Sequence, residues 1–410
     1  MDSKFIYEFS SQKTDGDASL SNLLGGKGAN LAEMSKLGIN VPPGFTITTE
    51  ACNYFSKNKK LPDGLKEEII NYVSNLENLS KKSFGNNDSP LLLSVRSGGM
   101  ISMPGMMDSI LNIGLNDDNV NILAKAFNDE RFALDSYRRL IQMYSNVVLG
   151  VEMDRFEAVI ANKKRMDNVI SDADFNVDQL DWIINAYKNT VERFTNSPFP
   201  QDPHEQLLGA IEAVFSSWQN KRAITYRKIN NIPDSLGTGV TVQTMVFGNL
   251  NDKSGTGVAF TRNPSNGSKE LYGEYLINAQ GEDVVAGIRT PHPIKNNDSV
   301  EQESLESKFP DAYKEITDIA SKLESHFKEV QDLEFTIENE KVYLLQTRKA
   351  KRTAQASIKI AIDLHNEGIT TKEESLIMVD ANTITNVLHP QFVQSQEKAL
   401  FTKALNASPG

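Results

Sequence analysis

The fold of this chain is decided by two alternating runs, Gln331-Asp332-Leu333-Glu334-Phe335-Thr336-Ile337 and Val342-Tyr343-Leu344-Leu345-Gln346-Thr347-Arg348. Polar and apolar residues alternate in both, so each run predicts a β-strand. In the first run, Leu333, Phe335 and Ile337 share one face, which leaves Asp332, Glu334 and Thr336 on the other. In the second run, Gln346 and Arg348 share a face. The polar residues 338–341 between the runs predict a hairpin turn.

The register of this hairpin decides whether its polar residues meet. A two-residue turn over residues 339–340 would place Glu334 opposite Leu345. An odd loop or a bulge centred near Glu340 would instead place Glu334 opposite Gln346. Because side chains alternate with a period of two, a slip of one residue sends one of these groups to the other face.

The second register would also set Asp332 opposite Arg348, so that two carboxylates, an amide and a guanidinium line one surface. Such a surface suits a Mg²⁺-nucleotide, since hard oxygens bind the metal and a guanidinium binds phosphate. A shared metal site therefore requires an odd loop or a bulge between Ile337 and Val342, in which Asn339 is the best candidate for a positive φ. The alternative is an amphipathic hairpin with a solvated charged face.

Two earlier segments carry groups that suit phosphate. An apolar strand runs through Arg96 into a loop of Gly, Ser and Met that ends at Asp108. Arg96 supplies fixed positive charge, and the glycines let the backbone fold closely over a bound group. In residues 24–31, Lys27 stands among three glycines at the start of a predicted helix for which Gly38 is the natural end. An ordinary Met-rich loop and an ordinary helix start are the alternatives, and the P-loop spacing is absent.

These segments, in this order, resemble the pyruvate, phosphate dikinase family, and the resemblance extends over nearly the whole chain. The motifs that carry it are Gly25-Gly26-Lys27-Gly28, Val41-Pro42-Pro43-Gly44-Phe45, Ser94-Val95-Arg96-Ser97-Gly98, Met103-Pro104-Gly105-Met106-Met107-Asp108, Gln243-Thr244-Met245-Val246-Phe247-Gly248-Asn249, Gly257-Val258-Ala259-Phe260-Thr261-Arg262-Asn263-Pro264, Gly273-Glu274-Tyr275, Ala279-Gln280-Gly281-Glu282-Asp283-Val284-Val285 and Leu344-Leu345-Gln346-Thr347-Arg348. The ordered set is highly specific, although each motif alone is fallible.

The resemblance implies a phosphotransferase with paired acceptors. Enzymes of this family move the β,γ-diphosphoryl unit of Mg·ATP onto a histidine and release AMP. They then pass one phosphoryl group to inorganic phosphate, which gives pyrophosphate, and the other to pyruvate, which gives phosphoenolpyruvate. The implied cofactor is Mg²⁺ with ATP, and the implied partners are ATP or AMP, inorganic phosphate and a phosphohistidine domain. The full-length protein is expected to be a homodimer.

The resemblance also assigns site residues. Lys27 and Arg96 match the phosphate-binding lysine and arginine, and are the expected catalytic groups. The remaining ATP-binding residues that it implies are Gln243, Met245, Val246, Glu282, Asp283, Asp332, Glu334, Gln346 and Arg348. Among these, Asp332, Glu334 and Gln346 are the expected metal ligands, while residues 243–246 would form the strand beside the adenine.

The histidines indicate that part of the reaction lies elsewhere. The five histidines are His204, His292, His326, His365 and His389. None stands in the Thr-Ser-His setting of the family's phosphorylated histidine, so each is expected to be a surface or packing residue. The sequence is therefore interpreted as the nucleotide end of a longer protein, and this chain alone is expected to lack the full reaction.

Composition agrees with a part of an intracellular enzyme. The chain has 410 residues, a net charge of −11 and a single cysteine, Cys52. One cysteine excludes an intramolecular disulfide and fits a reducing compartment. The negative charge argues against nucleic acid as the main partner. The start lacks a signal-peptide pattern and no apolar run approaches 18 residues, so no membrane is expected and the location is predicted to be cytoplasmic.

The predicted architecture is α+β, an ATP-grasp-like nucleotide-binding domain with a helical insertion and a C-terminal helical linker. The expected parts are a first ATP-grasp-like subdomain (1–115 plus about 220–250), a helical subdomain (116–219), a second ATP-grasp-like subdomain with the metal-site hairpin (251–352) and a helical linker (353–410) towards an absent phosphohistidine domain. The alternative for the last part is membership of the main core.

Two other functions remain open at this point. A phosphoenolpyruvate synthase or another water dikinase would share the nucleotide domain. Such relatives usually carry an acidic, Ser- and Ala-rich sequence where this chain has residues 102–108. The second alternative is a nucleotide-binding module without catalysis, and sequence beyond Gly410 would distinguish it from an enzyme.

Overall fold

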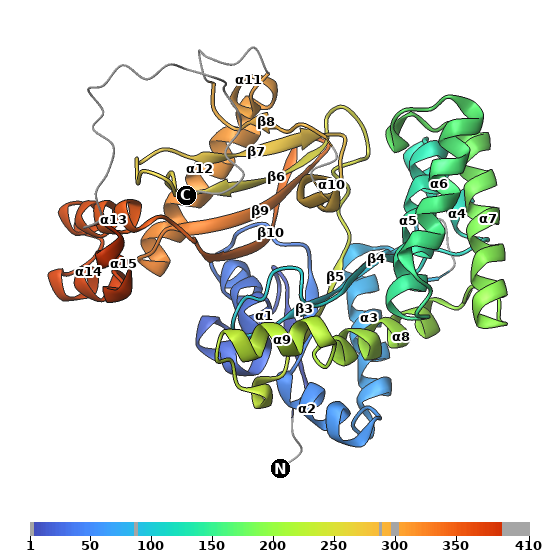
Figure 1. Ribbon diagram of the computed structural model, residues 1–410, viewed down its shortest axis with the longest axis horizontal. Coiled ribbons are helices and arrows are strands. Elements are labelled where there is room, and N and C mark those ends of the chain that lie inside the picture. Colours follow the sequence, from blue (N-terminus) through green and yellow to red (C-terminus); the bar gives the residue numbers. More distant parts are fainter. Residues whose placement is uncertain (1–3, 86–88, 287–288, 297–302, 388–410) are drawn as a thin grey trace. The chain divides into compact units, whose positions relative to one another are not determined.

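The computed structural model describes residues 4–85, 89–286, 289–296 and 303–387. The chain divides into two compact units, Met1–Val246 and Phe247–Gly410. Each unit contains a five-stranded antiparallel sheet together with helices (Figure 1). This combination of helices with separate antiparallel sheets agrees with the α+β class predicted from the sequence. His389 and the end of the predicted linker, residues 388–410, lie outside the described residues.

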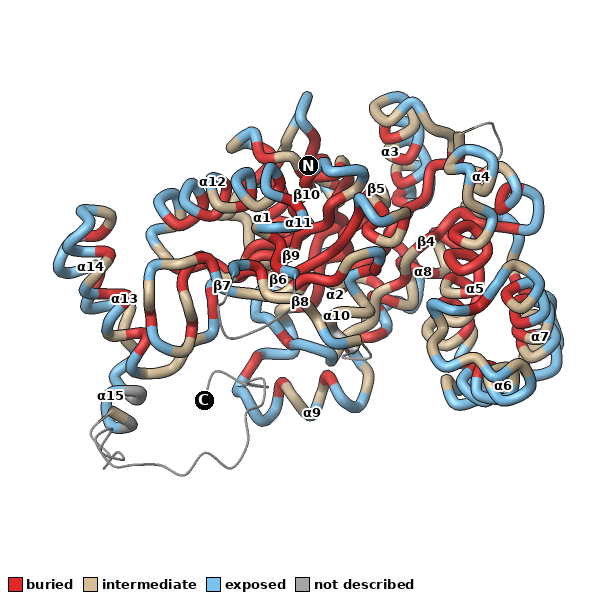
Figure 2. The backbone as a smooth tube through the Cα atoms, turned by 90° about the horizontal axis from the view of Figure 1, so that it is seen from above, coloured by how far each residue is buried: buried red, intermediate tan, exposed pale blue. Residues whose placement is uncertain are grey.

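The first unit is built on a sheet with the strand order β1-β2-β5-β3-β4. Its strands are β1 (Ile6–Phe9), β2 (Gly44–Ile47), β3 (Leu93–Gly98), β4 (Ser109–Ile113) and β5 (Gly239–Thr244). Helix α1 (Ser21–Lys36) contacts β1, β2, β3 and β5, whereas α8 (Pro203–Ser217) contacts β3, β4 and β5. Most residues of these strands are buried, as Figure 2 shows for β5, so the sheet forms the core of the unit.

The remaining helices of the first unit follow the pattern of caps and apolar spacing in the sequence. They are α2 (Thr49–Asn58), α3 (Leu65–Ser80), α4 (Val120–Phe127), α5 (Glu130–Val147), α6 (Met153–Asp167), α7 (Val177–Thr195) and α9 (Lys221–Ile229). Helix α7 begins with a reciprocal cap between Asn176 and Gln179 and ends at Asn196, which adopts the left-handed conformation. Helices α5, α6 and α7 pack on one another, and the rings of Phe156 and Tyr187 meet edge to face, 4.8 Å apart between centroids.

The second unit is built on a sheet with the strand order β10-β9-β6-β7-β8. Its elements are β6 (Gly255–Phe260), β7 (Tyr272–Ile277), α10 (Gly281–Ala286), β8 (His292–Pro293), α11 (Leu305–Lys308), α12 (Pro310–Phe327), β9 (Gln331–Glu338), β10 (Lys341–Lys349), α13 (Ala354–Asn366), α14 (Lys372–Met378) and α15 (Ala381–Val387). Leu333, Phe335 and Ile337 are fully buried, and α12 packs on β9 and β10. The alternation in the sequence therefore separated the core face of the hairpin from its polar face correctly.

The hairpin has the predicted pairing but not the predicted turn. Glu334 lies opposite Gln346, as the metal-site register requires. The turn itself has only two residues, Asn339 and Glu340, with φ of 47° and 68°. The prediction of an odd loop or a bulge near Glu340 is therefore wrong, although the positive φ of Asn339 is confirmed. The shift of register lies further along, where Leu345 bulges out between its neighbours.

A two-residue turn with two positive φ values has the twist that antiparallel strands need, so it closes the hairpin without an extra residue. Residues 251–254 hold this turn in place. The Lys253 carbonyl accepts a hydrogen bond from the Glu340 N–H (2.9 Å), and the Ser254 hydroxyl accepts one from the Asn339 N–H (3.1 Å). These long-range bonds explain how Glu340, which disfavours a positive φ, is kept in this conformation.

Among the described residues, no helix combines the length and the apolar character that crossing a membrane requires.

Candidate functional site

In the first unit, Lys27 is placed by a close approach between α1 and the end of β3. Helix α1 is interrupted at Gly25, where φ is 68° and ψ is 163°. A Cβ on Gly25 would lie 1.6 Å from the Gly98 carbonyl oxygen, so only glycine fits there. The Gly26 N–H donates to the Gly99 carbonyl oxygen (3.0 Å), which fixes the same contact. The Lys27 side chain therefore begins directly beside Gly98, the last residue of β3.

The same helix covers the sheet face that carries Arg96. A Cβ on Gly28 would lie 2.6 Å from the Thr46 side chain, so α1 lies directly against β2. Thr46 pairs with Thr241, and Thr241 pairs with Arg96. Residues paired in an antiparallel sheet point to the same face. Arg96 therefore lies on the sheet face that α1 covers, and Lys27 is carried by that helix.

Arg96 is oriented by Gln243. Arg96 is 9% exposed, and its Nη2 donates to the Oε1 of Gln243. The Nε2 of Gln243 donates in turn to the Pro42 carbonyl oxygen (2.9 Å). The amide of Gln243 thus links the guanidinium to a backbone carbonyl. Such a chain of hydrogen bonds keeps a buried cation in a defined place.

Met245 and Val246 follow β5 at the end of the first unit and are half-buried. The Met245 N–H donates to the Leu92 carbonyl oxygen (2.9 Å) and is therefore already engaged. The preceding N–H, of Thr244, is engaged by the Pro43 carbonyl oxygen (3.0 Å). If residues 243–246 bind an adenine ring, they must therefore do so through backbone groups other than these two N–H groups.

The loop after β3 is held by a residue that the sequence did not single out. Arg222 on α9 donates to the Met106 carbonyl oxygen (3.1 Å) and forms an ion pair with Asp108. Asn220 also donates to Asp108 (3.1 Å). Because Arg222 lies more than 100 positions beyond the loop, no local pattern could have shown that it fastens the Gly- and Met-rich segment.

In the second unit, the hairpin brings together the four polar groups that its register predicted. The Nε2 of Gln346 donates to Glu334 Oε1 (2.8 Å), and the Nε of Arg348 donates to Asp332 Oδ2 (2.8 Å). The two pairs lie on one face of β9 and β10. Asp332 and Gln346 are each 7% exposed, whereas Glu334 is partly buried and the Arg348 side chain is 40% exposed, so the face is buried at two of its groups and open at Arg348.

The electrostatics of this face favour a bound cation. Burial raises the pKa of Asp332 above its ordinary value of 3.8, the Arg348 guanidinium opposes that rise, and the nearby Glu334 charge adds to it. Each carboxylate keeps a second oxygen beyond its hydrogen bond to the neighbouring strand, and Gln346 keeps its amide oxygen. Carboxylate and amide oxygens are the donors that Mg²⁺ prefers, so these residues fit that ion.

Glu282 and Asp283 lie in the first turn of the short helix α10, and are partly buried. The Asp283 carboxylate accepts from the Gln280 N–H (2.9 Å), so it caps its own helix. Within the described parts of the chain, no three His, Cys, Asp or Glu side chains gather closely enough to hold a metal ion. Glu282 and Asp283 therefore do not join the hairpin carboxylates in such a cluster.

One further carboxylate shares the hairpin's polar face. Glu274 on β7 pairs with Val258 on β6, and Val258 pairs with Glu334. Paired residues share a face, so Glu274 stands two strands away from Glu334 on the same side of the sheet. Burial raises the pKa of Glu274. Tyr272 and Leu276 share the face of Glu274 on β7, so no polar and apolar alternation marks this carboxylate, and its position follows only from the strand order.

Comparison with known proteins identifies relatives along the whole chain. A family model described as "Pyruvate phosphate dikinase, AMP/ATP-binding domain" matches residues 21–84, 57–309 and 293–368. The chain is 51% identical to "Pyruvate, phosphate dikinase" of Clostridium symbiosum and 49% identical to that of Rhizobium meliloti. It is 46% identical to "Pyruvate, phosphate dikinase 1, chloroplastic" of Arabidopsis thaliana. Each alignment covers 99% of this chain but only 46%, 46% and 42% of the relative, so the chain spans about half the length of these proteins.

Proposed function

Because this chain belongs to the pyruvate phosphate dikinase AMP/ATP-binding domain family, we propose that it is the Mg·ATP-binding part of a pyruvate, phosphate dikinase. The full reaction converts ATP, phosphate and pyruvate into AMP, pyrophosphate and phosphoenolpyruvate. In this proposal the chain presents the β,γ-diphosphoryl unit of ATP to a histidine on another part of a longer protein. That longer protein would be a cytoplasmic homodimer.

The proposed fold is ATP-grasp-like, with Lys27 and Arg96 binding phosphate oxygens and residues 243–246 flanking the adenine. Two further pairs complete the site: the polar pair Glu282–Asp283, and Arg348 beside Asp332. The proposed subdomains are 1–115 with about 220–250, 116–219, 251–352 and a linker 353–410. Half of the relatives' length lies outside this chain, which leaves room for a phosphohistidine domain.

The observation that carries the proposal is the pairing of Glu334 with Gln346 and of Asp332 with Arg348 on one sheet face. Asp332, Glu334 and Gln346 would hold Mg²⁺ through their oxygens. When bound, the ion would neutralise charge on the phosphates, which is the main requirement of phosphoryl transfer. Arg348 opposes the rise that burial causes in the pKa of Asp332, and so favours the ionised form that a metal ligand requires.

Calorimetry with Mg·ATP tests this proposal. The wild-type chain should bind, and Arg96→Ala should weaken binding by about 1.5 to 3 kcal/mol, because phosphate charge would lose a charged hydrogen bond. Glu334→Gln should weaken binding of Mg·ATP more than binding of ATP with the metal removed. Arg193→Ala serves as the control, since Arg193 is exposed on α7. Equal affinities of wild type and Arg96→Ala would refute the assignment.

The reaction itself provides a second test. The 410-residue chain should bind Mg·ATP but should not form phosphoenolpyruvate from pyruvate, ATP and phosphate, because none of its histidines has the expected setting. Adding the remaining part of the protein in trans should restore only some turnover, since separation lowers the effective concentration of the histidine. Robust turnover by this chain alone would contradict the proposed division of labour.

A further inference from the structure

Arg262, the second residue after β6, has a fully buried side chain whose guanidinium joins two helices. Its Nε and Nη2 donate to Glu324 Oε1 of α12 (3.0 and 2.7 Å). Its Nη1 and Nη2 donate to the two carboxylate oxygens of Glu367 at the end of α13 (3.0 and 2.8 Å). Burial lowers the pKa of Arg262, but the hydrogen bonds to Glu367 and Glu324 outweigh this effect and raise it. The guanidinium therefore stays charged and bound on both sides.

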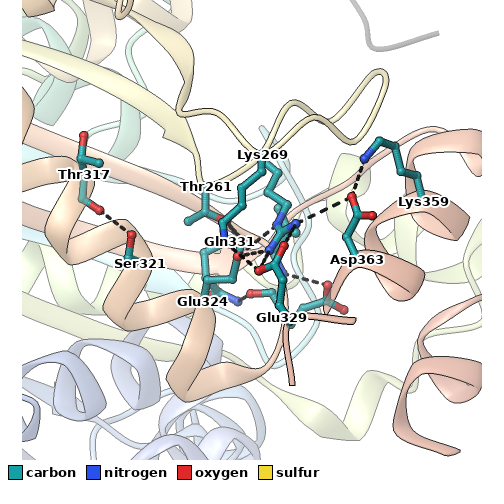
Figure 3. Close-up of polar contacts among 12 residues, drawn as sticks. Thr261, Lys269, Thr317, Ser321, Glu324, Glu329, Gln331, Lys359 and Asp363 are labelled. Atoms are coloured by element: carbon teal, nitrogen blue, oxygen red, sulfur yellow. Dashed lines mark hydrogen bonds and ion pairs between the residues drawn. The ribbon is translucent and has the colours of Figure 1, made fainter. Parts of the chain in front are cut away.

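This cluster continues to the polar hairpin through Thr261 and Gln331. The hydroxyl of Thr261 donates to Glu324 Oε2 (2.7 Å) and accepts from the Gln331 N–H (3.1 Å). The Thr261 N–H donates back to the Gln331 carbonyl oxygen (3.0 Å). Figure 3 shows the side chains of Thr261, Glu324 and Gln331 gathered at this point. Since Gln331 immediately precedes Asp332, the network ends at the backbone of a proposed metal ligand.

The second strand of the hairpin is attached to the same network. The hydroxyl of Thr347 donates to Gln331 Oε1 (2.9 Å). Thr347 stands between Gln346 and Arg348, which both belong to the polar face. Thr347 and Gln331 point to the side opposite that face, where they are buried beneath it. The cluster around Arg262 therefore supports both strands from behind the proposed site.

Stability alone does not account for a charged cluster in this place. Replacing a buried ion pair by apolar side chains is often neutral or stabilising, because removing charges from water is costly. An apolar cluster already packs α13 beside it; its members are Val330, Ala350, Ala356, Ile360 and Leu364. Apolar contacts have no preferred direction, whereas a guanidinium that hydrogen-bonds two carboxylates, with Asp363 as a third at 3.9 Å, fixes distances and angles. The charged cluster around Arg262 therefore fixes the orientation of α13, whereas apolar packing already holds the helix in contact.

We infer that Arg262 is a positioning residue of the Mg·ATP site, holding Asp332 in place through Thr261 and Gln331 and tying that place to helix α13. This inference rests on the proposed function. Of the two carboxylates, Glu324 is nearly inaccessible, with a side chain 7% exposed. The Glu367 side chain is 25% exposed and also pairs with Lys269. Docking of α13 and binding of Mg·ATP consequently favour each other.

The test compares Arg262→Lys with wild type by calorimetry, using ATP with Mg²⁺ and ATP with the metal chelated. Lysine keeps the charge but cannot bind two carboxylates through a planar fork. Mg·ATP affinity should fall about tenfold, the lower end of the losses seen when groups supporting metal ligands are removed. Affinity for metal-free ATP should change by less than about twofold, since the effect acts through the metal ligand.

Glu367→Gln is the milder second variant, because its side chain is partly exposed and Glu324 keeps its hold on Arg262. It should weaken Mg·ATP binding about threefold and speed hydrogen exchange of the α13 amides, as weakened docking requires. Arg138→Lys is the matched control. Arg138 is equally buried and paired with Asp135, but lies on α5 in the other unit. It should lower stability and leave the ratio of the two affinities unchanged.

The outcomes separate the inference from the proposed function. If wild type does not bind Mg·ATP, the proposed function fails and the inference fails with it. If wild type binds and both variants are less stable yet bind Mg·ATP with wild-type affinity, Arg262 is structural only and the inference alone is overturned. A selective loss of Mg·ATP affinity in Glu367→Gln supports the inference even if Arg262→Lys does not fold.

Discussion

The two groups of proposed ATP-binding residues, one in each unit, are positioned by different physics. In the first unit, Lys27 is positioned by the close contact of α1 with β3. The backbone at Gly25 lies so near the Gly98 carbonyl oxygen that only glycine fits there. In the second unit, Glu334 and Gln346 meet because two strands pair in one register. The first arrangement depends on the absence of side chains at a long-range contact, and the second on the alternation of side chains along each strand. The two groups should therefore fail under different mutations.

The largest effect is expected at Gly25. Gly25→Ala would force a left-handed conformation on alanine and set its Cβ 1.6 Å from the Gly98 carbonyl oxygen. The free energy of unfolding should fall by about 3 kcal/mol or more, the sum of the conformational and overpacking costs. Urea unfolding measures this loss. Gly38→Ala is the control, because Gly38 also has a positive φ (72°) but has open space around its Cβ position.

For Gly38→Ala we expect a loss of about 1 kcal/mol, from the conformation alone. The difference between the two variants combines the close approach of α1 to β3 with the backbone conformation of Gly25, whose φ of 68° and ψ of 163° only glycine adopts readily. Equal losses would mean that the contact with Gly98 yields easily, and that Lys27 is not positioned by it.

The second unit should instead respond to pH through Asp332. Burial, aided by the Glu334 charge, raises the pKa of Asp332 above 3.8 despite Arg348. A group with a raised pKa stabilises the fold below its unfolded pKa and loses that contribution as the pH rises through the folded value. Ionised Asp332 therefore costs stability near neutrality, and a bound cation would offset that cost.

Mg·ATP affinity should fall as the pH drops through the raised pKa of Asp332, because a proton then competes with the metal. The loss should approach tenfold per pH unit, about 1.4 kcal/mol, for one displaced proton. Calorimetry from pH 8 downwards would measure it. Asp332→Asn provides the reference curve, which keeps the titration of the nucleotide and of every other group and lacks only that of Asp332. Parallel curves for the two proteins would show that Asp332 does not take part in metal binding.

The contrast between the two groups also explains what the sequence could predict. Alternation in β9 and β10 is a local signal, so the polar face, the pairing of Glu334 with Gln346 and the positive φ of Asn339 could be predicted. The position of the bulge could not, because residues 251–254 stabilise a two-residue turn from outside the hairpin. The shift then fell at Leu345, where no local pattern marks it.

Long-range contacts account for the other omissions. Arg222 fastens the loop before Asp108 from 114 positions away, and Arg262 binds Glu367 from 105 positions away. Neither spacing has a local period. Glu274 has Tyr272 and Leu276 as neighbours on its own face of β7, and its place beside the hairpin depends on the strand order, which composition and periodicity do not determine. Local chemistry was predictable, and the neighbours that tertiary packing supplies were not.

The bulge itself can be tested by deletion. Removing Leu345 should leave Glu334 opposite Gln346, because Gln346 would then follow Leu344 directly in an unbroken register. The expected loss of stability is about 1 kcal/mol, from one half-buried leucine, with little change in Mg·ATP affinity. Deleting Thr347 is the control, since it would set Arg348 opposite Leu333 on the apolar face. If removal of Leu345 abolished nucleotide binding while Thr347 could be removed freely, the described register would be wrong.

The smallest effect is expected at Glu274. Measuring it tests how far the polar face extends beyond the hairpin. Burial raises the pKa of this carboxyl, so its ionised form costs stability once the pH exceeds the folded value. Glu274→Gln should therefore raise the free energy of unfolding near pH 7 by about 0.5 kcal/mol at most, because solvent screens a partly exposed charge, and by nothing well below pH 4, where the carboxyl is uncharged in both the folded and the unfolded state. Urea unfolding at several pH values would measure the difference, with Glu157→Gln on the exposed side of α6 as the control. A variant less stable than wild type at neutral pH would mean that the Glu274 charge is favourable in the folded unit, and that the face is not uniformly short of positive charge.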